Sequence, residues 1–277
     1  MKTLRTFFAD LFDGRAASQP TPIPGAQGLD FMLQAGFTPV GQFLEPDIFI
    51  AGYPKSGNTW FQNLIAGIYF GVDPEFAPDT LVQELVPDIH FKTYYQRFKT
   101  PMFFKTHNLP KSEYKRVVYL VRDGRDVMVS YYHHQIAMLG ENIDFMMMVR
   151  DGKDLFPSKW HEHVQAWDAN LYHAEKIVIK YEDLKQDPLS VLNQFCDFAQ
   201  IKRDPTFIKQ VIDKTEFSKL QSKEKSGQMF FANQAWPGNH RFFRRGMIGS
   251  HKDEMPSEVL DVFLKEAEPT LKSLGYV

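Results

Sequence analysis

A lysine in a short glycine-containing turn is the first group in this sequence that could bind an anion. Residues 53–60 read Tyr-Pro-Lys-Ser-Gly-Asn-Thr-Trp and lie between an apolar run and a helical pattern. Backbone N–H groups at a helix start point outward, and the helix dipole favours negative charge there. Lys55 adds a full positive charge. The turn therefore predicts a phosphate site; the structural alternative is an ordinary strand-to-helix turn with a solvated lysine, and the Walker pattern is absent.

An arginine and a serine form a second candidate anion site. Arg122 ends an apolar run, and Ser130 follows about two helical turns later. A planar guanidinium binds phosphate through two parallel hydrogen bonds, and a serine hydroxyl can donate another. The alternative is a run of surface ion pairs, because Asp123, Arg125 and Asp126 are close by in the sequence.

A histidine after the strand pattern of residues 102–104 is a candidate general base. His107 lies two residues after Lys105. A neighbouring cation favours the neutral imidazole, which is the form that accepts a proton. The alternative is a structural histidine.

A fourth segment combines aromatic and basic residues. Phe242 is followed by a second phenylalanine and then by Arg244, Arg245 and Gly246. Two arginines suit a phosphate, and the aromatic rings suit a stacked base. The alternative is a mobile basic loop.

The elements that must position these groups alternate along the chain. Short apolar runs predict buried strands, and apolar residues at helical spacing predict helices between them. The strands are expected at residues 47–51, 102–104, 117–121 and 176–180, and helices at 60–68, which Gly71 ends, 127–131, 158–174 and 189–195. Such alternation favours a parallel sheet, and ligands of these sheets bind at the carboxyl ends of the strands.

Composition excludes several classes of protein. The chain has 277 residues, 43% of them hydrophobic and 24% charged, which is typical of a globular protein. The net charge of -2 argues against nucleic acid as the main partner. No apolar stretch reaches the ~20 residues of a membrane span. The single cysteine favours a reducing compartment, and we expect a cytoplasmic location.

The chain is expected to have two parts. Residues 1–45 form a leader with a short amphipathic helix at residues 1–14, which either packs on the body or anchors to a membrane surface, and an irregular segment at residues 15–28. Residues 46–277 form the functional domain. Acidic residues do not cluster at the lysine turn as magnesium ligands would, so no metal is expected.

Five segments in this order resemble the PAPS-dependent sulfotransferase family, where PAPS is 3′-phosphoadenosine 5′-phosphosulfate. They are residues 53–60, 105–107, 118–130, 181–184 and 244–249. The resemblance implies a P-loop NTPase-like α/β fold with a central parallel sheet flanked by helices. It also implies transfer of a sulfuryl group from PAPS to a hydroxyl or amine of a small acceptor, with PAP as the product and without a metal.

The resemblance implies a role for each residue. Lys55 stabilises charge on the leaving phosphate, His107 deprotonates the acceptor, and Lys105 stabilises the transferring sulfuryl group. Arg122 and Ser130 hold the 3′-phosphate, and Ser130 is also counted with the catalytic residues. The remaining donor-binding residues are Ser56, Gly57, Asn58, Thr59, Trp60, which stacks on the adenine, Tyr181, Thr215, Phe217, Leu220, Phe242, Arg244, Arg245 and Gly246.

This sequence also departs from the family pattern. Ser250 and His251 stand where the family commonly has Asp-Trp, and the family dimer pattern is not recognisable in residues 253–259, so the oligomeric state stays open. His134 stands where many members place a phenylalanine that lines the acceptor site, which predicts a more polar pocket. Residues 139–157 either cover that site or belong to the core.

Other predictions concern packing and function. His161 and His163 are expected on a solvated helix face, Leu171 on a buried face, and Cys196 in the core. Residues 253–255 are expected to form a turn.

Two other functions remain open: a P-loop kinase acting on a small molecule, and a nucleotide-binding module without turnover.

Overall fold

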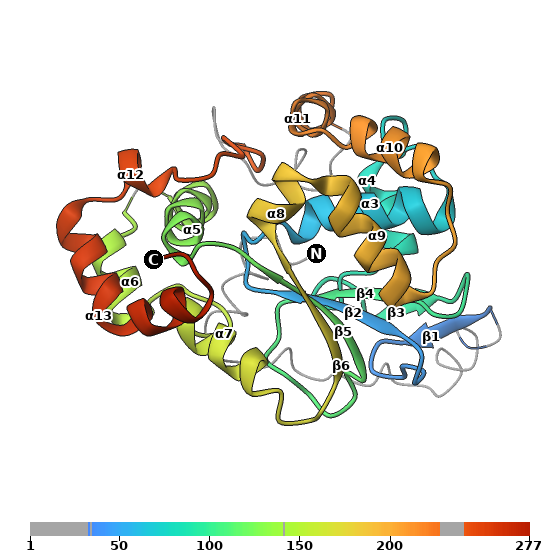
Figure 1. The fold of residues 1–277 in the computed structure, drawn as a ribbon, viewed down its shortest axis with the longest axis horizontal. Coiled ribbons are helices and arrows are strands. Elements are labelled where there is room, and N and C mark those ends of the chain that lie inside the picture. Colours follow the sequence, from blue (N-terminus) through green and yellow to red (C-terminus); the bar gives the residue numbers. More distant parts are fainter. Residues whose placement is uncertain (1–32, 34, 141, 228–240) are drawn as a thin grey trace, which may run out of the picture.

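A parallel four-stranded sheet forms the centre of the molecule, with strands in the order β4-β2-β5-β6. The computed structural model describes residue 33 and residues 35–140, 142–227 and 241–277. The strands are β2 (Ile48–Gly52), β4 (Phe103–Thr106), β5 (Arg116–Val121) and β6 (Glu175–Lys180). Figure 1 shows helices on both sides of these strands, so the expected architecture of a parallel sheet flanked by helices is confirmed.

The helices follow the strands in the predicted alternation. They are α3 (Asn58–Phe70), α4 (Asp79–Leu85), α5 (Gly124–Leu139), α6 (Phe145–Asp151), α7 (Trp160–Ala169), α8 (Tyr181–Gln186), α9 (Pro188–Ala199), α10 (Pro205–Lys214), α11 (Phe217–Lys225), α12 (His251–Glu254) and α13 (Ser257–Ser273). None of the helices in the described ranges is long and apolar enough to cross a lipid bilayer.

A small second sheet connects the predicted leader to the body. β1 (Phe37–Pro39) pairs antiparallel with β3 (Tyr94–Gln96). The helix expected at residues 1–14 and the irregular segment at 15–28 lie outside the described residues. The domain boundary at residues 45 and 46 stays a prediction.

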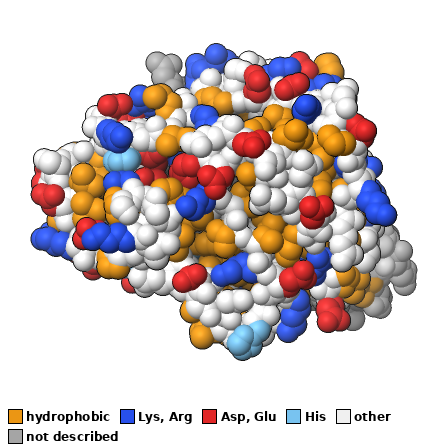
Figure 2. Space-filling model, viewed as in Figure 1, with side chains coloured by type: hydrophobic (Ala, Val, Ile, Leu, Met, Phe, Trp, Pro, Cys, Tyr) orange, Lys and Arg blue, Asp and Glu red, His pale blue; other side chains and the backbone are white. Residues whose placement is uncertain are grey.

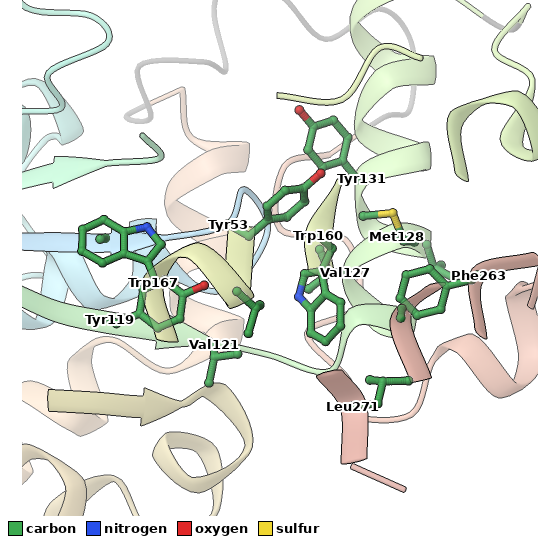
Figure 3. Close-up of a cluster of buried hydrophobic side chains, with 14 of the residues drawn as sticks. Tyr53, Tyr119, Val121, Val127, Met128, Tyr131, Trp160, Trp167, Phe263 and Leu271 are labelled. Atoms are coloured by element: carbon green, nitrogen blue, oxygen red, sulfur yellow. The ribbon is translucent and has the colours of Figure 1, made fainter. Parts of the chain in front are cut away.

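β2, β4 and β5 are buried on both faces of the central sheet, because their side chains are mainly apolar on both faces, whereas the edge strand β6 is largely part-exposed. Successive side chains of a strand point to opposite faces. Phe49 and Ala51 accordingly belong to a core cluster with residues of α5, α7 and α13, whereas Ile48 and Ile50 belong to a cluster with α3, α9 and α10. Figure 3 shows part of the first cluster, which brings side chains of β5, α5, α7 and α13 together.

The lysine turn needs glycine where α3 begins. Gly57 is the N-cap of α3 and has φ 97°, a left-handed conformation that suits glycine. A Cβ atom at this position would lie 2.9 Å from the ring of Tyr181. The turn therefore approaches α8 closely, which places it next to the carboxyl end of β6. Gly71 ends the helix, as expected.

Several sequence predictions about element ends were wrong. The helix expected over residues 158–174 ends at Ala169, because Asn170 is left-handed and its side chain bonds both the N–H and the carbonyl of Ala174. Leu171 is therefore 73% exposed instead of buried. Lys105 lies within β4 instead of after it, and residues 253–255 contain the end of α12 instead of a turn.

Residues 139–157 divide between the two alternatives, because Phe145, Met148 and Val149 belong to the core and Phe156 lines the cavity described below. Within them, α6 packs on α13. Phe145 and Met148 are buried, and the Phe145 ring stacks on Tyr132 with centroids 4.4 Å apart. Cys196 is buried, as expected.

Candidate active site

One cavity of about 380 Å³ lies at the carboxyl ends of β2, β4 and β5. It brings together segments that are far apart in the sequence. Of the predicted site residues, these line it: Lys55, Gly57, Asn58, Thr59, Trp60, Lys105, His107, Arg122, Ser130, Tyr181, Phe217, Leu220, Phe242, Arg244, Arg245 and Gly246.

Two predicted site residues lie behind the wall of the cavity. Thr215 is fully buried, and its hydroxyl donates to the carbonyl oxygens of Val211 and Ile212 in α10. Its side chain therefore completes the end of a helix instead of facing the cavity. Ser56 in the lysine turn is 2% exposed and is not among the residues that line the cavity.

Lys55 is partly buried and lies close to other cations. Its Nζ atom lies 3.9 Å from the centre of the Phe242 ring, and its carbonyl oxygen accepts a hydrogen bond of 3.3 Å from Arg122. Burial, and then the charges of Arg122 and Lys105, lower the pKa of Lys55 to about 7. An anion bound here would reverse the electrostatic part of this shift.

The lysine turn also holds buried polar atoms that lack partners. Among the residues described, the Ser56 hydroxyl, both amide atoms of Asn58 and Nε of Arg122 are buried without a hydrogen bond. A buried polar group without a partner costs about 1–3 kcal/mol. Lysine, arginine, hydroxyl and amide groups together fit a ligand with phosphate or sulfonate oxygens, so the residues of this chain suit a doubly phosphorylated nucleotide.

Arg122 is held from several sides. Its guanidinium carbon lies 4.4 Å from the centre of the Tyr181 ring, and Nη2 donates to the Met247 carbonyl at 2.8 Å. The carboxylate of Asp126 lies 3.7 Å from Nη2. The surface ion pairs that were the alternative also form, because Arg125 pairs with Asp123 at 2.7 Å, but Arg122 itself lines the cavity.

Arg244 and Arg245 line the cavity and already have an anionic partner. Glu254 at the end of α12 accepts from both guanidinium groups. Sequence reasoning missed this contact, because residues 253–255 were expected only to form a turn. In Figure 2, acidic and basic side chains lie next to each other over α12, and charges of both signs are interspersed across this face.

His107 is oriented by a backbone carbonyl. Its Nδ1 atom lies 2.7 Å from the carbonyl oxygen of Gly52. A carbonyl can only accept, so Nδ1 carries the proton and Nε2 has the free lone pair. Burial, and then the charge of Lys105, lower the pKa of His107 to about 3. The neutral imidazole predicted from the sequence is confirmed, although burial contributes more than the neighbouring lysine.

Lys105 pairs with an acid that sequence reasoning missed. Its Nζ atom lies 3.0 Å from Asp88 Oδ2 and 3.3 Å from Thr59 Oγ1. Both members of the ion pair are buried. Asp88 reaches this place because its backbone pairs with Lys105 in a parallel bridge, which the sequence pattern does not reveal.

Two further histidines contact the backbone of His107. His90 Nε2 accepts from the His107 N–H at 2.9 Å, and the two rings stack with centroids 5.6 Å apart. His163 Nε2 donates to the His107 carbonyl at 3.2 Å, and its Nδ1 accepts from the Tyr119 hydroxyl. The predicted solvated position of His163 was wrong, because the residue is fully buried. Its spacing from Trp160 and Trp167 places the three side chains on one face of α7, and this spacing could have indicated that His163 is buried.

The end of the cavity near His107 combines imidazole and aromatic groups. Its walls include His90, Phe91, Tyr131, His134 and Phe156. Burial lowers the pKa of His134 well below its ordinary value, and the charge of Lys55 adds to this. The predicted polar side chain at position 134 therefore lies in the cavity as a neutral imidazole.

Comparison with known proteins identifies the family. The model of the sulfotransferase domain matches residues 45–275. A flavonol 3-sulfotransferase of Flaveria bidentis is 30% identical over 263 residues, which cover 83% of this chain and 83% of the relative. A 3-beta-hydroxysteroid sulfotransferase of Cavia porcellus is 26% identical over 222 residues, which cover 75% of this chain and 77% of the relative.

Solved structures share the fold. Retinol dehydratase in a complex with retinol and PAP has a TM-score of 0.63 and 20% identity, with 82% of each chain covered. Mouse sulfotransferase SULT7A1 complexed with PAP has a TM-score of 0.61 and 21% identity, with 81% of this chain and 85% of that chain covered. The family match favours sulfuryl transfer over the kinase and the non-catalytic module. This chain belongs to the PAPS-dependent sulfotransferase family and is an enzyme with its P-loop-like α/β fold.

Proposed function

We propose that this enzyme transfers the sulfuryl group of PAPS to a hydroxyl or an amine of a small acceptor, with His107 as the general base. The observation that carries the proposal is the position of His107 in the same cavity as Lys55 and Lys105. The Gly52 carbonyl fixes the His107 ring so that Nε2 holds the free lone pair.

The donor would bind across the cationic end of the cavity. Lys55 and the turn of Ser56, Gly57, Asn58 and Thr59 would hold the 5′-phosphosulfate, and Trp60 would stack on the adenine. Arg122, Ser130, Arg244, Arg245 and Gly246 would hold the 3′-phosphate. Tyr181, Phe217, Leu220 and Phe242 would line the nucleotide pocket, with Thr215 supporting it from behind. Support comes from the cations and from the partnerless buried atoms of Ser56, Asn58 and Arg122.

In the transfer step, the acceptor oxygen attacks sulfur and its proton goes to Nε2 of His107. The bond between sulfur and the bridging oxygen breaks, and its electron pair stays on the phosphate of PAP. Lys55 would stabilise this developing charge, and Lys105 would stabilise the sulfuryl oxygens. The charge of Asp88 favours protonated His107, so the product imidazolium has a compensating anion. The negative charges of bound PAPS would act in the same direction as Asp88 and raise the pKa of His107.

The acceptor would carry a second polar group. Besides Phe91 and Phe156, the wall near His107 contains His90 and His134. Burial lowers the pKa of both imidazoles, so both are neutral near pH 7, and because His90 Nε2 accepts from the His107 N–H, Nδ1 of His90 carries its proton. An entirely apolar acceptor would desolvate these groups without replacing their hydrogen bonds. We therefore favour a flat aromatic acceptor with more than one hydroxyl group.

The decisive test is sulfuryl transfer from labelled PAPS to a panel of mono- and dihydroxy aromatic compounds. His107→Ala should lower kcat by about 10²–10⁴-fold, the usual contribution of a positioned base, and leave PAP affinity within about twofold. The control is His161→Ala, which changes a partly exposed histidine of α7 outside the cavity. Unchanged turnover in His107→Ala would remove His107 as the base.

A cytoplasmic location is part of this proposal. It is supported by the single cysteine, Cys196, which is buried and has no disulfide partner.

A further inference from the structure

One carboxylate next to the donor site accepts hydrogen bonds from three basic side chains. Glu254 accepts from Arg244 in a bidentate geometry, with Nη1–Oε1 3.0 Å and Nη2–Oε2 2.7 Å. Arg245 donates through Nη1 to Oε1. His133 Nε2 lies 3.1 Å from Oε2. Guanidinium groups form the same paired hydrogen bonds with phosphate oxygens.

Among the described residues, the Glu254 carboxylate contacts side chains and not backbone groups. Asp126 differs, because it accepts from the backbone N–H groups of Gly249 and His251 and is fully buried. Loss of the Asp126 contacts would release the loop, whereas the Glu254 carboxylate can leave the arginines without breaking a backbone hydrogen bond. The Glu254 side chain is also 16% exposed, so it has water to turn towards.

We propose that Glu254 competes with the 3′-phosphate of the donor and of the product PAP for Arg244 and Arg245. This inference rests on the proposed function, in which both arginines bind that phosphate. A carboxylate and a phosphate dianion on the same two guanidinium groups would repel each other, so nucleotide binding displaces Glu254. Return of the carboxylate accelerates the release of PAP. Product release limits the turnover of many enzymes, so the competition favours turnover at the expense of affinity.

The experiment compares two nucleotides and two variants of the full chain. PAP and AMP differ by the 3′-phosphate, and calorimetry gives the affinity of each. Glu254→Gln keeps the shape of the side chain and removes its charge. The matched control is Asp253→Asn, because Asp253 lies 3.6 Å from Arg245 and is 65% exposed.

Glu254→Gln should bind PAP about three- to tenfold more tightly, since part-exposed ion pairs are individually weak. AMP affinity should stay unchanged, and stopped-flow measurements should show slower PAP release by a similar factor. Asp253→Asn should change neither affinity by more than about twofold.

Three results would overturn the inference. Weaker PAP binding in Glu254→Gln would show that Glu254 orients the arginines instead of competing for them. Unchanged PAP binding would show that the contact has no influence on the donor site. Equal tightening for PAP and AMP would show a general charge effect. If the unmodified protein binds PAP and AMP equally well, the proposed 3′-phosphate site itself is wrong, and that result is distinct from the other three.

Discussion

The two ends of the cavity are built from different chemistry. The proposed donor end contains Lys55, Arg122 and buried polar atoms without hydrogen-bond partners. The acceptor end contains neutral imidazoles, His90 and His134, beside aromatic rings. The cations at one end suit a highly negative ligand that is the same throughout the family. The neutral hydrogen-bonding groups and the shape of the other end suit a ligand that differs from one family member to the next.

The comparison shows which part of the cavity can be predicted from the sequence and which part requires the structure. A polyanion requires cations at strand ends and N–H groups at a helix start, and these requirements leave a motif in the sequence. Neutral hydrogen-bonding walls require only that side chains from any element face the same space. Variants at the two ends should therefore fail in different ways, and the largest effects on nucleotide affinity are expected at the donor end.

The first prediction concerns the guanidinium group of Arg122 at the donor end. Arg122→Ala should weaken PAP binding by about 10–100-fold, because a hydrogen bond to a charged group contributes about 1.5–3 kcal/mol. AMP binding should change far less, since it lacks the 3′-phosphate. Calorimetry with both nucleotides measures the two losses. Equal losses for PAP and AMP would place the 3′-phosphate elsewhere. The control Arg125→Ala removes an arginine that pairs with Asp123 and does not line the cavity.

The second prediction concerns pH and tests the charge of Lys55. Because its pKa in the free protein is about 7, Lys55 loses its proton as the pH rises above 7, and an anion binds the protonated form. PAP affinity should therefore fall as the pH rises from 7 to 9, by up to about tenfold per pH unit. Calorimetry in buffers of different ionisation enthalpy should detect proton uptake on binding. In Lys55→Arg the side chain stays charged, so this slope should disappear. A slope that persists in Lys55→Arg would assign the titration to another group.

The third and smallest prediction addresses the acceptor end. His134→Phe should shift the ratio of kcat/KM for a dihydroxy over a monohydroxy aromatic acceptor by about three- to tenfold towards the monohydroxy compound, because one hydrogen bond contributes about 0.5–1.5 kcal/mol. PAP affinity should change by less than about twofold if the two ends are independent. A loss of PAP affinity that matches the loss of turnover would show that His134 serves the donor end, where the charge of Lys55 acts on it.

Much of the donor end was predictable from the sequence. The apolar run at residues 47–51, the glycine turn and the helix to Gly71 are local patterns, and the structure has them within a residue or two. Lys55, Arg122 and His107 follow strands that are parallel neighbours, so their convergence at one edge follows from the topology. Thr215 and Ser56 do not line the cavity, and the Thr215 hydroxyl bonds the end of its own helix instead.

Tertiary structure alone decided which distant side chains share the site. Asp88 lies beside Lys105 because a single backbone bridge joins the two residues, and Glu254 meets Arg244 because the short helix α12 folds back on the segment before it. His163 lies behind His107 because α7 packs its tryptophan face against the sheet. Local propensity and periodicity predict which face of a helix or strand is apolar. They do not predict which polar side chain of another element will contact that helix or strand, because this depends on how whole helices and strands pack together.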